Sequence, residues 1–346
     1  MEDTATTTNT GLSVEQAVRD ILDTIERERE REIIARRFGL FDRRETLEQI
    51  GELLGITRER VRQLEKSVVT KLKEAAKGDL PHIKAAQSAL DKHLVNNGKV
   101  ARVSEVASNL VPDAGKADSA RITFLATLSP QIAVIDDNDH FFHAIGLAGE
   151  HTEKAIREQV SKIIDAVTEI GEPTDIKTIA DKVGNLDVQH VEALASISKN
   201  MASLHGRWGL TKWPMVNPKN IRDKIYVILH DSGKPMHFSE IAKAIKNSDL
   251  KRRDVTTQAI HNELIKDNRF VLIGRGIYAL REWGYTSGTV ADVITEILKK
   301  EGGPLHRDEI VKRVLKSRHV KETTILLNLQ SKPQFKRVAK ATYTLA

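Results

Sequence analysis

The segment Thr46–Lys73, TLEQIGELLGITRERVRQLEKSVVTKLK, constrains the fold of this chain most strongly, because its spacing suits two helices joined by a tight turn. Gly51 falls where the two helices must touch, and Gly55 falls where the turn needs a positive φ. Thr57 is placed as the N-cap of the second helix, with Arg60 instead of a glutamate at the capping-box position. The apolar residues that would be buried between the helices are Leu47, Ile50, Leu54, Ile56, Val61, Leu64 and Val68. This pattern predicts a helix-turn-helix.

The second predicted helix begins with five polar side chains at positions that would face solvent. They are Arg58, Glu59, Arg60, Arg62 and Gln63. Arginine and glutamine can form bidentate hydrogen bonds with guanine and adenine edges, and glutamate can accept a hydrogen bond from cytosine. The segment therefore predicts a helix that reads DNA bases. The alternative is a short amphipathic helix pair whose charges form only a solvated surface.

The same residues carry a family resemblance. The sequence ITRERVRQLEKSVVTKL resembles the recognition helix of region 4 of bacterial housekeeping-type sigma factors, and IIARRFGLFDRRETLEQIGELLG is similar to the rest of that region. The resemblance covers about residues 15–77. It implies binding to the minus-35 promoter element and to the flap of RNA polymerase.

This resemblance also implies roles for single residues. Those implied to read bases are Arg58, Glu59, Arg62 and Gln63. Those implied to hold phosphates are Arg44, Thr46, Thr57, Arg60 and Lys66. Because phosphate contacts fix the register and base contacts specify the sequence, the two groups should respond differently to mutation.

The N-terminal part of the chain differs from that of a complete sigma factor. That family also carries an aromatic-rich region that melts the minus-10 element, and nothing before residue 15 could supply it. Residues 1–12 are a Thr-rich polar leader without the apolar core of a signal peptide, and we expect them to be disordered. We therefore expect a promoter-reading module attached to other modules, and not a complete sigma factor.

Cysteine content and the spacing of polar residues exclude several kinds of site. The chain has no cysteine, so it has no thiol nucleophile, no cysteine-zinc site and no disulfide. No apolar run is long enough to span a membrane. His140, His143 and His151 lack helical metal-ligand spacing, and no Ser/His/Asp or paired-carboxylate set stands out. We expect no enzymatic activity, no cofactor, no metal and no membrane partner, and a cytoplasmic, nucleoid-associated location.

Charge is distributed unevenly along the chain. Residues 1–79 hold 15 Lys and Arg against 17 Asp and Glu, and residues 80–216 hold 14 against 17. Residues 217–346 hold 25 against 14, which is a net charge of +11. The C-terminal part is therefore basic on an otherwise slightly acidic chain, and basic surfaces attract nucleic acid through counterion release.

An internal repeat organises the chain after residue 80. Four segments align: GKVARVSEVASNL from Gly98, GEPTDIKTIADKV from Gly171, GKPMHFSEIAKAI from Gly233 and GGPLHRDEIVKRV from Gly302. Each lies between an amphipathic helix and a third helix with a strand-like ending, which is the order of a winged helix-turn-helix. The alternative is a set of unrelated helical hairpins. The expected divisions are a leader (1–12), a sigma region 4-like helix-turn-helix (13–79) and four winged-helix modules (80–149, 150–216, 217–285 and 286–346).

Residues 217–285 carry a second family resemblance. KIYVILHDSGKPMHFSEIAKAI and HNELIKDNRFVLIGRGIYALREWGY resemble the HARE-type helix-turn-helix, a winged module found in bacterial RNA polymerase delta subunits, restriction-linked proteins and eukaryotic chromatin factors. Residues 286–346 resemble a weaker copy that lacks the GRG turn and the terminal EWGY. Turns at Gly274–Gly276 and Ala339–Ala341 predict a hairpin in each of these modules. We therefore expect a mainly α chain of tandem helix-turn-helix and winged-helix domains with short β-hairpin wings.

The last two modules offer a candidate second DNA surface. Its residues are Lys251, Arg252, Arg253, Gln258, Asn262, Arg275, Arg318, Lys321, Lys336, Arg337 and Lys340. Such residues could neutralise phosphates while a wing enters a groove, and the alternative is a solvated basic surface. In the first of the four expected winged-helix modules (80–149), the wing position instead holds Asp136, Asp137, Asn138 and Asp139. DNA would repel these acidic side chains. We expect the modules of residues 80–149 and 150–216 to act as spacers or protein-docking units.

Together these patterns favour a sequence-specific transcription factor. It would read double-stranded promoter DNA with the first helix-turn-helix and use basic winged helices as a second DNA contact. RNA polymerase is a further candidate partner. Two alternatives stay open: a polymerase-associated accessory protein comparable to a delta subunit, and the DNA-targeting subunit of a modification or restriction system.

Overall fold

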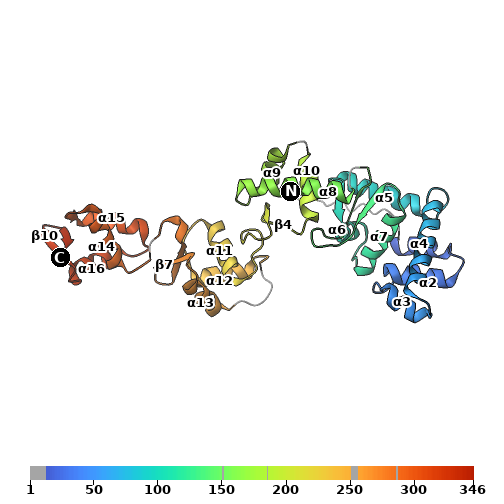
Figure 1. Ribbon diagram of the computed structural model, residues 1–346. Helices are drawn as coiled ribbons and strands as arrows, with labels where there is room; N and C mark the ends of the chain where they lie inside the picture. Colours follow the sequence, from blue (N-terminus) through green and yellow to red (C-terminus); the bar gives the residue numbers. More distant parts are fainter. Residues whose placement is uncertain (1–12, 150–151, 185, 251–255, 286) are drawn as a thin grey trace. The chain divides into compact units, whose positions relative to one another are not determined.

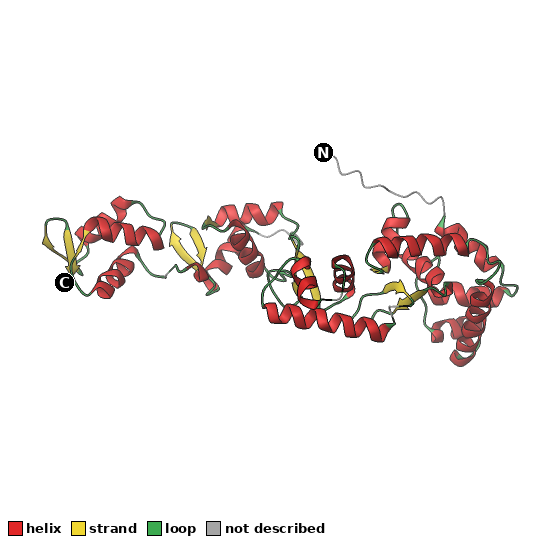
Figure 2. Ribbon diagram, turned by 90° about the horizontal axis from the view of Figure 1, so that it is seen from above, coloured by secondary structure: helices red, strands yellow, loops and turns green. Residues whose placement is uncertain are grey.

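The computed structural model describes residues 13–149, 152–184, 186–250, 256–285 and 287–346. The leader (1–12), His151 and the cations Lys251, Arg252 and Arg253 lie outside the described residues. The chain forms two compact units that divide between Lys212 and Trp213. Both consist of helices with small antiparallel sheets, drawn in yellow in Figure 2. The expected mainly α fold with short hairpins is confirmed.

The N-terminal unit begins with four helices. They are α1 (Val14–Asp23), α2 (Glu28–Phe38), α3 (Leu47–Leu54) and α4 (Arg58–Ala75). Ile33 of α2, Ile50 of α3 and Val61 of α4 have no exposed surface and form one apolar cluster, which holds these three helices together. Gly55 ends α3 with a φ of 64°, a conformation that favours glycine, so the turn before α4 follows from the sequence.

Two further segments complete this unit, each with three helices and a hairpin. The first contains α5 (Ile83–Asn96), β1 (Val100–Arg102), α6 (Val103–Leu110), α7 (Lys116–Leu128), β2 (Ile132–Ile135) and β3 (Ala144–Leu147). The second contains α8 (Glu153–Ile170), α9 (Ile176–Val183), α10 (Val188–Ile197), β4 (Met201–Leu204) and β5 (Arg207–Leu210). The first sheet has the order β1-β3-β2, and in the second segment a bridge between Thr174 and Trp208 takes the place of the first strand.

The C-terminal unit repeats this order twice. Its first half contains α11 (Ile221–Ser232), β6 (Met236–His237), α12 (Phe238–Asn247), α13 (Thr257–Lys266), β7 (Phe270–Gly274), β8 (Ile277–Leu280) and a 3-10 turn (Arg281–Trp283). Its second half contains α14 (Val290–Glu301), β9 (Leu305–His306), α15 (Arg307–Ser317), α16 (Glu322–Ser331), β10 (Phe335–Ala339) and β11 (Thr342–Leu345). The sheet orders, β6-β8-β7 and β9-β11-β10, are equivalent. Gly276 and Ala341 have φ values of 70° and 57° at the two hairpin turns, where the sequence predicts turns.

The sequence repeat coincides with a common structural element. The apolar residue eight positions after each repeated glycine has no exposed surface; these residues are Val106, Ile179, Ile241 and Ile310. A third helix and a hairpin follow each of them. For description, we call the four-helix segment (13–79) the first module, and the four segments with three helices and a hairpin (80–149, 150–216, 217–285 and 286–346) the second to fifth modules; we call the hairpin of each its wing.

In the N-terminal unit, the third helix of the second module and that of the third module each pack on the module before it. Helix α7 lies against α1, α2 and α4 (Figure 1), and its Arg121 donates from Nε to the Leu40 carbonyl over 2.9 Å. Helix α10 lies against β1 of the second module, and six of its ten residues are buried. His190 Nδ1 is 2.6 Å from the Gly98 carbonyl oxygen. A Cβ on Gly98 would come within 2.3 Å of the Gln189 carbonyl oxygen, so α10 sits directly on that glycine.

The fourth and fifth modules meet differently, through the segment that follows α15. The His319 amide donates to the Ile273 carbonyl of β7 over 3.1 Å. A Cβ on Gly274 would come within 2.6 Å of the His319 carbonyl oxygen, so the two backbones are in close contact. Helices α13 and α16 bury only two residues each. The third helices of the C-terminal unit therefore keep a broad exposed face.

Candidate nucleic-acid interface

Two threonines fix the N-terminal ends of α3 and α4. The Thr46 hydroxyl accepts a hydrogen bond from the Gln49 amide (3.2 Å), and the Gln49 side chain accepts one from the Thr46 amide (2.9 Å), which completes a capping box. The Thr57 hydroxyl accepts from the Arg60 amide over 3.2 Å, so α4 has the N-cap that its sequence predicts. The amides at a helix start attract anions, so the beginning of α4 suits a DNA phosphate.

The two helices approach closely at Gly51. A Cβ at this position would come within 2.7 Å of the Ile56 carbonyl oxygen, which confirms the close approach that the sequence predicts. From α2, Arg29 Nη2 donates to the Leu54 carbonyl over 2.5 Å and satisfies one carbonyl at the end of α3. The turn is thus held from two sides, and α4 is fixed relative to α3.

The four residues implied to read bases lie on the first two turns of α4, and all four are exposed. They are Arg58, Glu59, Arg62 and Gln63. Arg62 and Glu59 form two hydrogen bonds, of 2.9 and 2.7 Å, and Gln63 Nε2 lies 3.5 Å from Glu59 Oε1. The hydrogen bonds from Arg62 lower the pKa of the Glu59 carboxyl below its usual value. Glu59 is therefore ionised at neutral pH and orients the Arg62 guanidinium on the free helix.

The residues implied to hold phosphates are distributed over α4 and the starts of α3 and α4. Arg60 and Lys66 are exposed on α4, and Arg44 is exposed in the loop before α3. Thr46 and Thr57 are exposed as well, but their hydroxyls already cap the two helices. The free amides of the helix starts, together with the three cations, are therefore the groups best placed for phosphate oxygens.

The loop that carries Arg44 is held by a residue that sequence reasoning missed. Arg121 is 8% exposed, bonds to the Leu40 carbonyl at the beginning of this loop, and forms ion pairs with Glu15 (2.9 Å) and Asp118 (2.8 Å). The only signal in the sequence is an arginine at the start of the apolar run RITFLATL, of whose eight residues six are buried. The second module thus supports the loop before α3.

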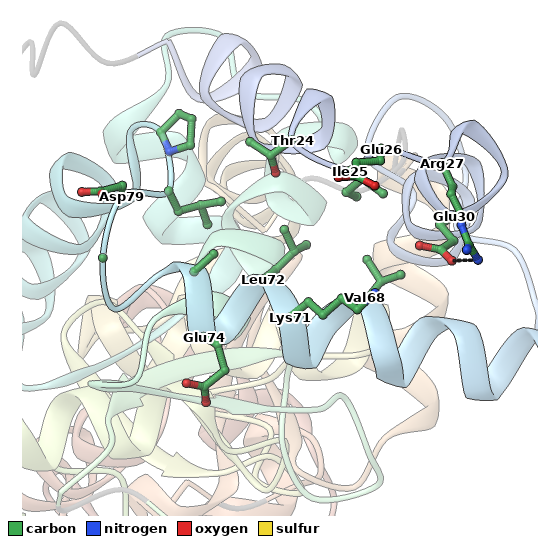
Figure 3. Close-up of a pocket in the computed structure, with 14 residues that line it drawn as sticks. Thr24, Ile25, Glu26, Arg27, Glu30, Val68, Lys71, Leu72, Glu74 and Asp79 are labelled. Carbon is green, nitrogen blue, oxygen red and sulfur yellow. Dashed lines mark hydrogen bonds and ion pairs between the residues drawn. The ribbon is translucent and has the colours of Figure 1, made fainter.

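A groove of about 660 Å³ lies between the α1–α2 turn and the second half of α4. Figure 3 shows Val68 and Leu72 of α4 pointing toward this turn, and Ile25 and Leu80 add to the apolar part of the lining. The charged residues of the lining are Glu26, Arg27, Glu30, Lys71, Glu74 and Asp79. Sequence reasoning missed this groove because its two sides, which end at Glu30 and begin again at Val68, lie far apart in the chain.

The candidate second DNA surface is divided between two modules. Gln258 and Asn262 are exposed on α13, and Arg275 is exposed in the wing turn of the fourth module. Four cations are exposed on the fifth module: Lys321, Lys336, Arg337 and Lys340. Within the part of the chain that the structure describes, none of these four forms an ion pair. They are therefore available to phosphates.

The prediction that Arg318 belongs to this exposed surface is wrong. Its side chain is 6% exposed, and its Nη1 donates to the Leu272 carbonyl over 2.5 Å while its Nη2 donates to the Gly288 carbonyl. Burial lowers the pKa of the guanidinium, and the nearby carboxylates of Asp292 and Glu296 act in the opposite direction. Arg318 joins the fourth and fifth modules and does not face solvent.

The acidic wing of the second module has a partner within the same unit. Lys199 of the third module donates from Nζ to the Asp137 carboxylate (2.8 Å) and to the Asn138 carbonyl (2.7 Å). The Phe142 amide donates to the Ile197 carbonyl over 2.9 Å. The wing of the second module therefore contacts the third module at a second place, in addition to the contact between α10 and β1.

The described residues offer neither a metal site nor a membrane-spanning helix. Among the described residues, no group of three or more His, Asp or Glu side chains is arranged to hold a metal ion. No described helix is long and apolar enough to cross a bilayer. His140 and His143 accordingly form no metal site with described neighbours.

Comparisons with known proteins agree on one region of the chain. Residues 27–74 match the family model of sigma-70, region 4. The RNA polymerase sigma factor SigA of Bacillus sp is 42% identical over 65 residues, which cover 18% of this chain and 17% of that protein. The chain thus spans less than a fifth of the length of this relative.

The α2–α4 region is therefore a sigma-70 region 4-like helix-turn-helix, a DNA-binding module of transcription. The resemblance of the first module to this region is confirmed by both matches. The resemblance of residues 217–285 to HARE-type modules stays a prediction.

Proposed function

We propose that this protein is a sequence-specific transcription factor that reads promoter DNA with α4. The observation that carries the proposal is the exposed set of Arg58, Glu59, Arg62 and Gln63 on the first two turns of a capped helix. In a helix-turn-helix, the N-terminal residues of the second helix contact base edges in the major groove. We propose that the protein acts by binding alone and is not an enzyme.

The Arg62–Glu59 pair gives this site a specific mechanism. In the free protein the two side chains satisfy each other. On a matching site, Arg62 exchanges the carboxylate for O6 and N7 of guanine, and Glu59 becomes free to accept from the N4 amino group of cytosine. On a mismatched site the exchange leaves polar groups unpaired, so the intact pair is favoured over binding. Arg44, Arg60 and Lys66 would hold the flanking phosphates.

A second DNA contact on the fifth module supports this function. Lys336 and Arg337 lie on β10, and Lys340 lies in its wing turn, all three exposed and without ion-pair partners among the described residues. Cations of this kind release counterions from any duplex, so they add affinity without adding sequence preference. The fifth module would then keep the protein on DNA while α4 selects the site.

The division between base and phosphate contacts can be tested in the full chain. Arg62→Ala should lower discrimination between a selected site and random duplex by about 5- to 150-fold. Lys340→Ala should weaken binding to both duplexes about equally and should reduce the salt dependence of binding by about one ion. Fluorescence anisotropy at several salt concentrations measures both effects. Equal losses on both duplexes for Arg62→Ala would refute base reading by α4.

The groove beside α4 favours a second candidate function, that of an RNA polymerase accessory protein. The groove is lined by both apolar and charged residues. It lies along the second half of α4, after the turns proposed to read bases. A protein segment could occupy it while DNA is bound. Pull-down of purified RNA polymerase after nuclease treatment tests this candidate, with Lys71→Glu as the variant that should weaken binding, because Lys71 lines the groove and is exposed. If Lys71→Glu does not bind less than the wild type, the groove is not the docking site.

A further inference from the structure

The third helices of the winged modules differ in what they expose. Helices α7 and α10 are covered by the preceding modules. Helix α16 begins with Glu322 and leaves the Leu327 side chain 62% exposed. Its Asn328 donates from Nδ2 to the Thr324 carbonyl over 2.8 Å, so this carboxamide is bonded to its own helix. Helix α13 instead has no acidic residue in its first turn and presents polar, uncharged side chains there. Among the described third helices, α13 therefore offers the surface best suited to base edges.

Two carboxamides stand one turn apart on the exposed face of α13. Gln258 Nε2 donates to Asn262 Oδ1 over 3.1 Å, and both side chains are exposed. Glutamine and asparagine are the side chains that bond to N6 and N7 of adenine in the major groove. Because neither is charged, their mutual hydrogen bond can be exchanged for a base at a lower desolvation cost than an ion pair would require.

Three described acidic residues near α13 are paired within the fourth module. Glu263 pairs with Arg222 at 3.2 Å. Arg269 pairs with Asp267 at 2.7 Å and with Asp223 at 3.2 Å. These pairs remove the repulsion that a free carboxylate would cause beside a phosphate.

A run of rings connects α13 to the wing turn. The His261 ring of α13 lies 4.9 Å from that of Phe238, and the Phe238 ring lies 4.4 Å from that of His237. A Cβ on Gly276 would come within 2.5 Å of His237 and 3.0 Å of Phe238, so the turn rests on both rings. Arg275 is exposed next to this contact. The backbone that carries Arg275 is thus in contact, through these rings, with α13.

From these contacts we propose that α13 is a second base-reading helix, which recognises adenine-containing duplex DNA through Gln258 and Asn262 while Arg275 binds the adjacent backbone. This proposal rests on one part of the proposed function, namely that the chain binds DNA. It does not depend on base reading by α4. The full site would then contain two separately read blocks, with phosphate contacts on the fifth module adding affinity.

Selection of bound sequences from a random duplex library, with the full chain, tests this proposal. The wild type should select two blocks, one of them rich in adenine. The double variant Gln258→Ala/Asn262→Ala should keep the first block and lose preference at the second by about 5- to 150-fold. Arg62→Ala should show the reverse pattern. Gln330→Ala, on the exposed face of α16, is the matched control and should keep both blocks.

The outcomes separate the two functional claims. A single selected block that disappears with Arg62→Ala overturns the role of α13, as does a second block that survives the double variant. If the wild type selects only the adenine-rich block, base reading by α4 is contradicted, whereas the role proposed for α13 is not. If the double variant is poorly folded, Gln258→Glu serves instead, because it keeps the size of the side chain and adds repulsion toward DNA.

Discussion

The N-terminal and C-terminal units use one three-helix pattern in opposite ways. In the N-terminal unit the third helices α7 and α10 are packing elements, and six residues are buried in each of them. In the C-terminal unit α13 and α16 bury two residues each, and the modules meet through a loop and the edge of β7. A helix that is apolar on most sides must be covered, whereas one with a single apolar stripe can face solvent. The place of a helix in the repeat therefore does not decide its role.

Each unit also contains a buried arginine that joins two modules. Arg121 in the N-terminal unit has two carboxylate partners and one carbonyl. Arg318 in the C-terminal unit bonds to two carbonyls. A guanidinium paired with carboxylates leaves charges behind when it is removed, whereas one bonded to carbonyls leaves only dipoles. The two joints should therefore differ in strength.

The largest expected effect is at the contact between α10 and the second module. Gly98→Ala should destabilise the N-terminal unit by about 3 kcal/mol or more, because the new Cβ meets the Gln189 carbonyl and the backbone is left-handed. Gly171→Ala is the matched control, since its φ of 79° is similar but nothing lies within 4 Å of the Cβ. It should cost only about 1–2 kcal/mol. Urea unfolding measures both, and equal losses would mean that α10 is not tightly packed there.

The two buried arginines give the next effect. We expect Arg121→Ala to cost about 2–4 kcal/mol, because it leaves a carbonyl and two partly covered carboxylates without their partner. Arg318→Ala should cost about 1–2 kcal/mol and should speed exchange of the His319 amide proton, which bonds to Ile273. Unfolding curves and hydrogen exchange test these values. An Arg318 loss as large as the Arg121 loss would contradict the proposed difference between the joints.

The smallest effect is a difference in pH response. Burial lowers the pKa of His93 and His143 in the N-terminal unit. The unfolded chain binds protons first, so this unit should lose stability as the pH falls below about 6.5, by less than about 1 kcal/mol per histidine after solvent screening. In the C-terminal unit, burial and a hydrogen bond to Glu282 raise the pKa of Tyr226 to about 12. The contribution of Tyr226 to the free energy of unfolding is therefore fully present below about pH 10 and is lost as the pH rises toward 12.

Variants separate these two pH responses. His93→Gln/His143→Gln should flatten the acid side of the thermal unfolding midpoint, and Tyr226→Phe should flatten the alkaline side. Each variant should leave the other side unchanged. Variant and wild-type curves that run parallel over the whole pH range would show that these three groups do not control the response.

Local features of the fold could be predicted from the sequence. Thr57 and Gly55 act within a few residues of their own positions, so the cap and the turn follow from residue type alone. The hairpin turns at Gly276 and Ala341 are local in the same sense. The predicted base-reading residues of α4 share one exposed face because helical spacing places them there.

Contacts between modules could not be predicted in this way. Arg318 follows a basic helix and resembles a surface residue until β7 and the segment before α14 close around it. Arg121 likewise acquires its role only when α7 meets the first module. A signal was present in α10, whose VQHVEALASI is apolar on most sides and therefore predicts a helix covered from more than one direction.

The hydrogen bonds of Arg318 to backbone carbonyls affect which positions of this joint can change during evolution. Since every amino acid supplies a carbonyl, Leu272 can mutate without removing the bond that it accepts. Two glycines are required as well: Gly288 by its φ of 122°, and Gly274 by its close contact with the His319 carbonyl. Apart from these glycines, the coding requirement for the hydrogen bonds of this joint falls on one arginine codon of the fifth module. Such a module could be copied or exchanged between genes and still attach to a neighbour with the same strand edge.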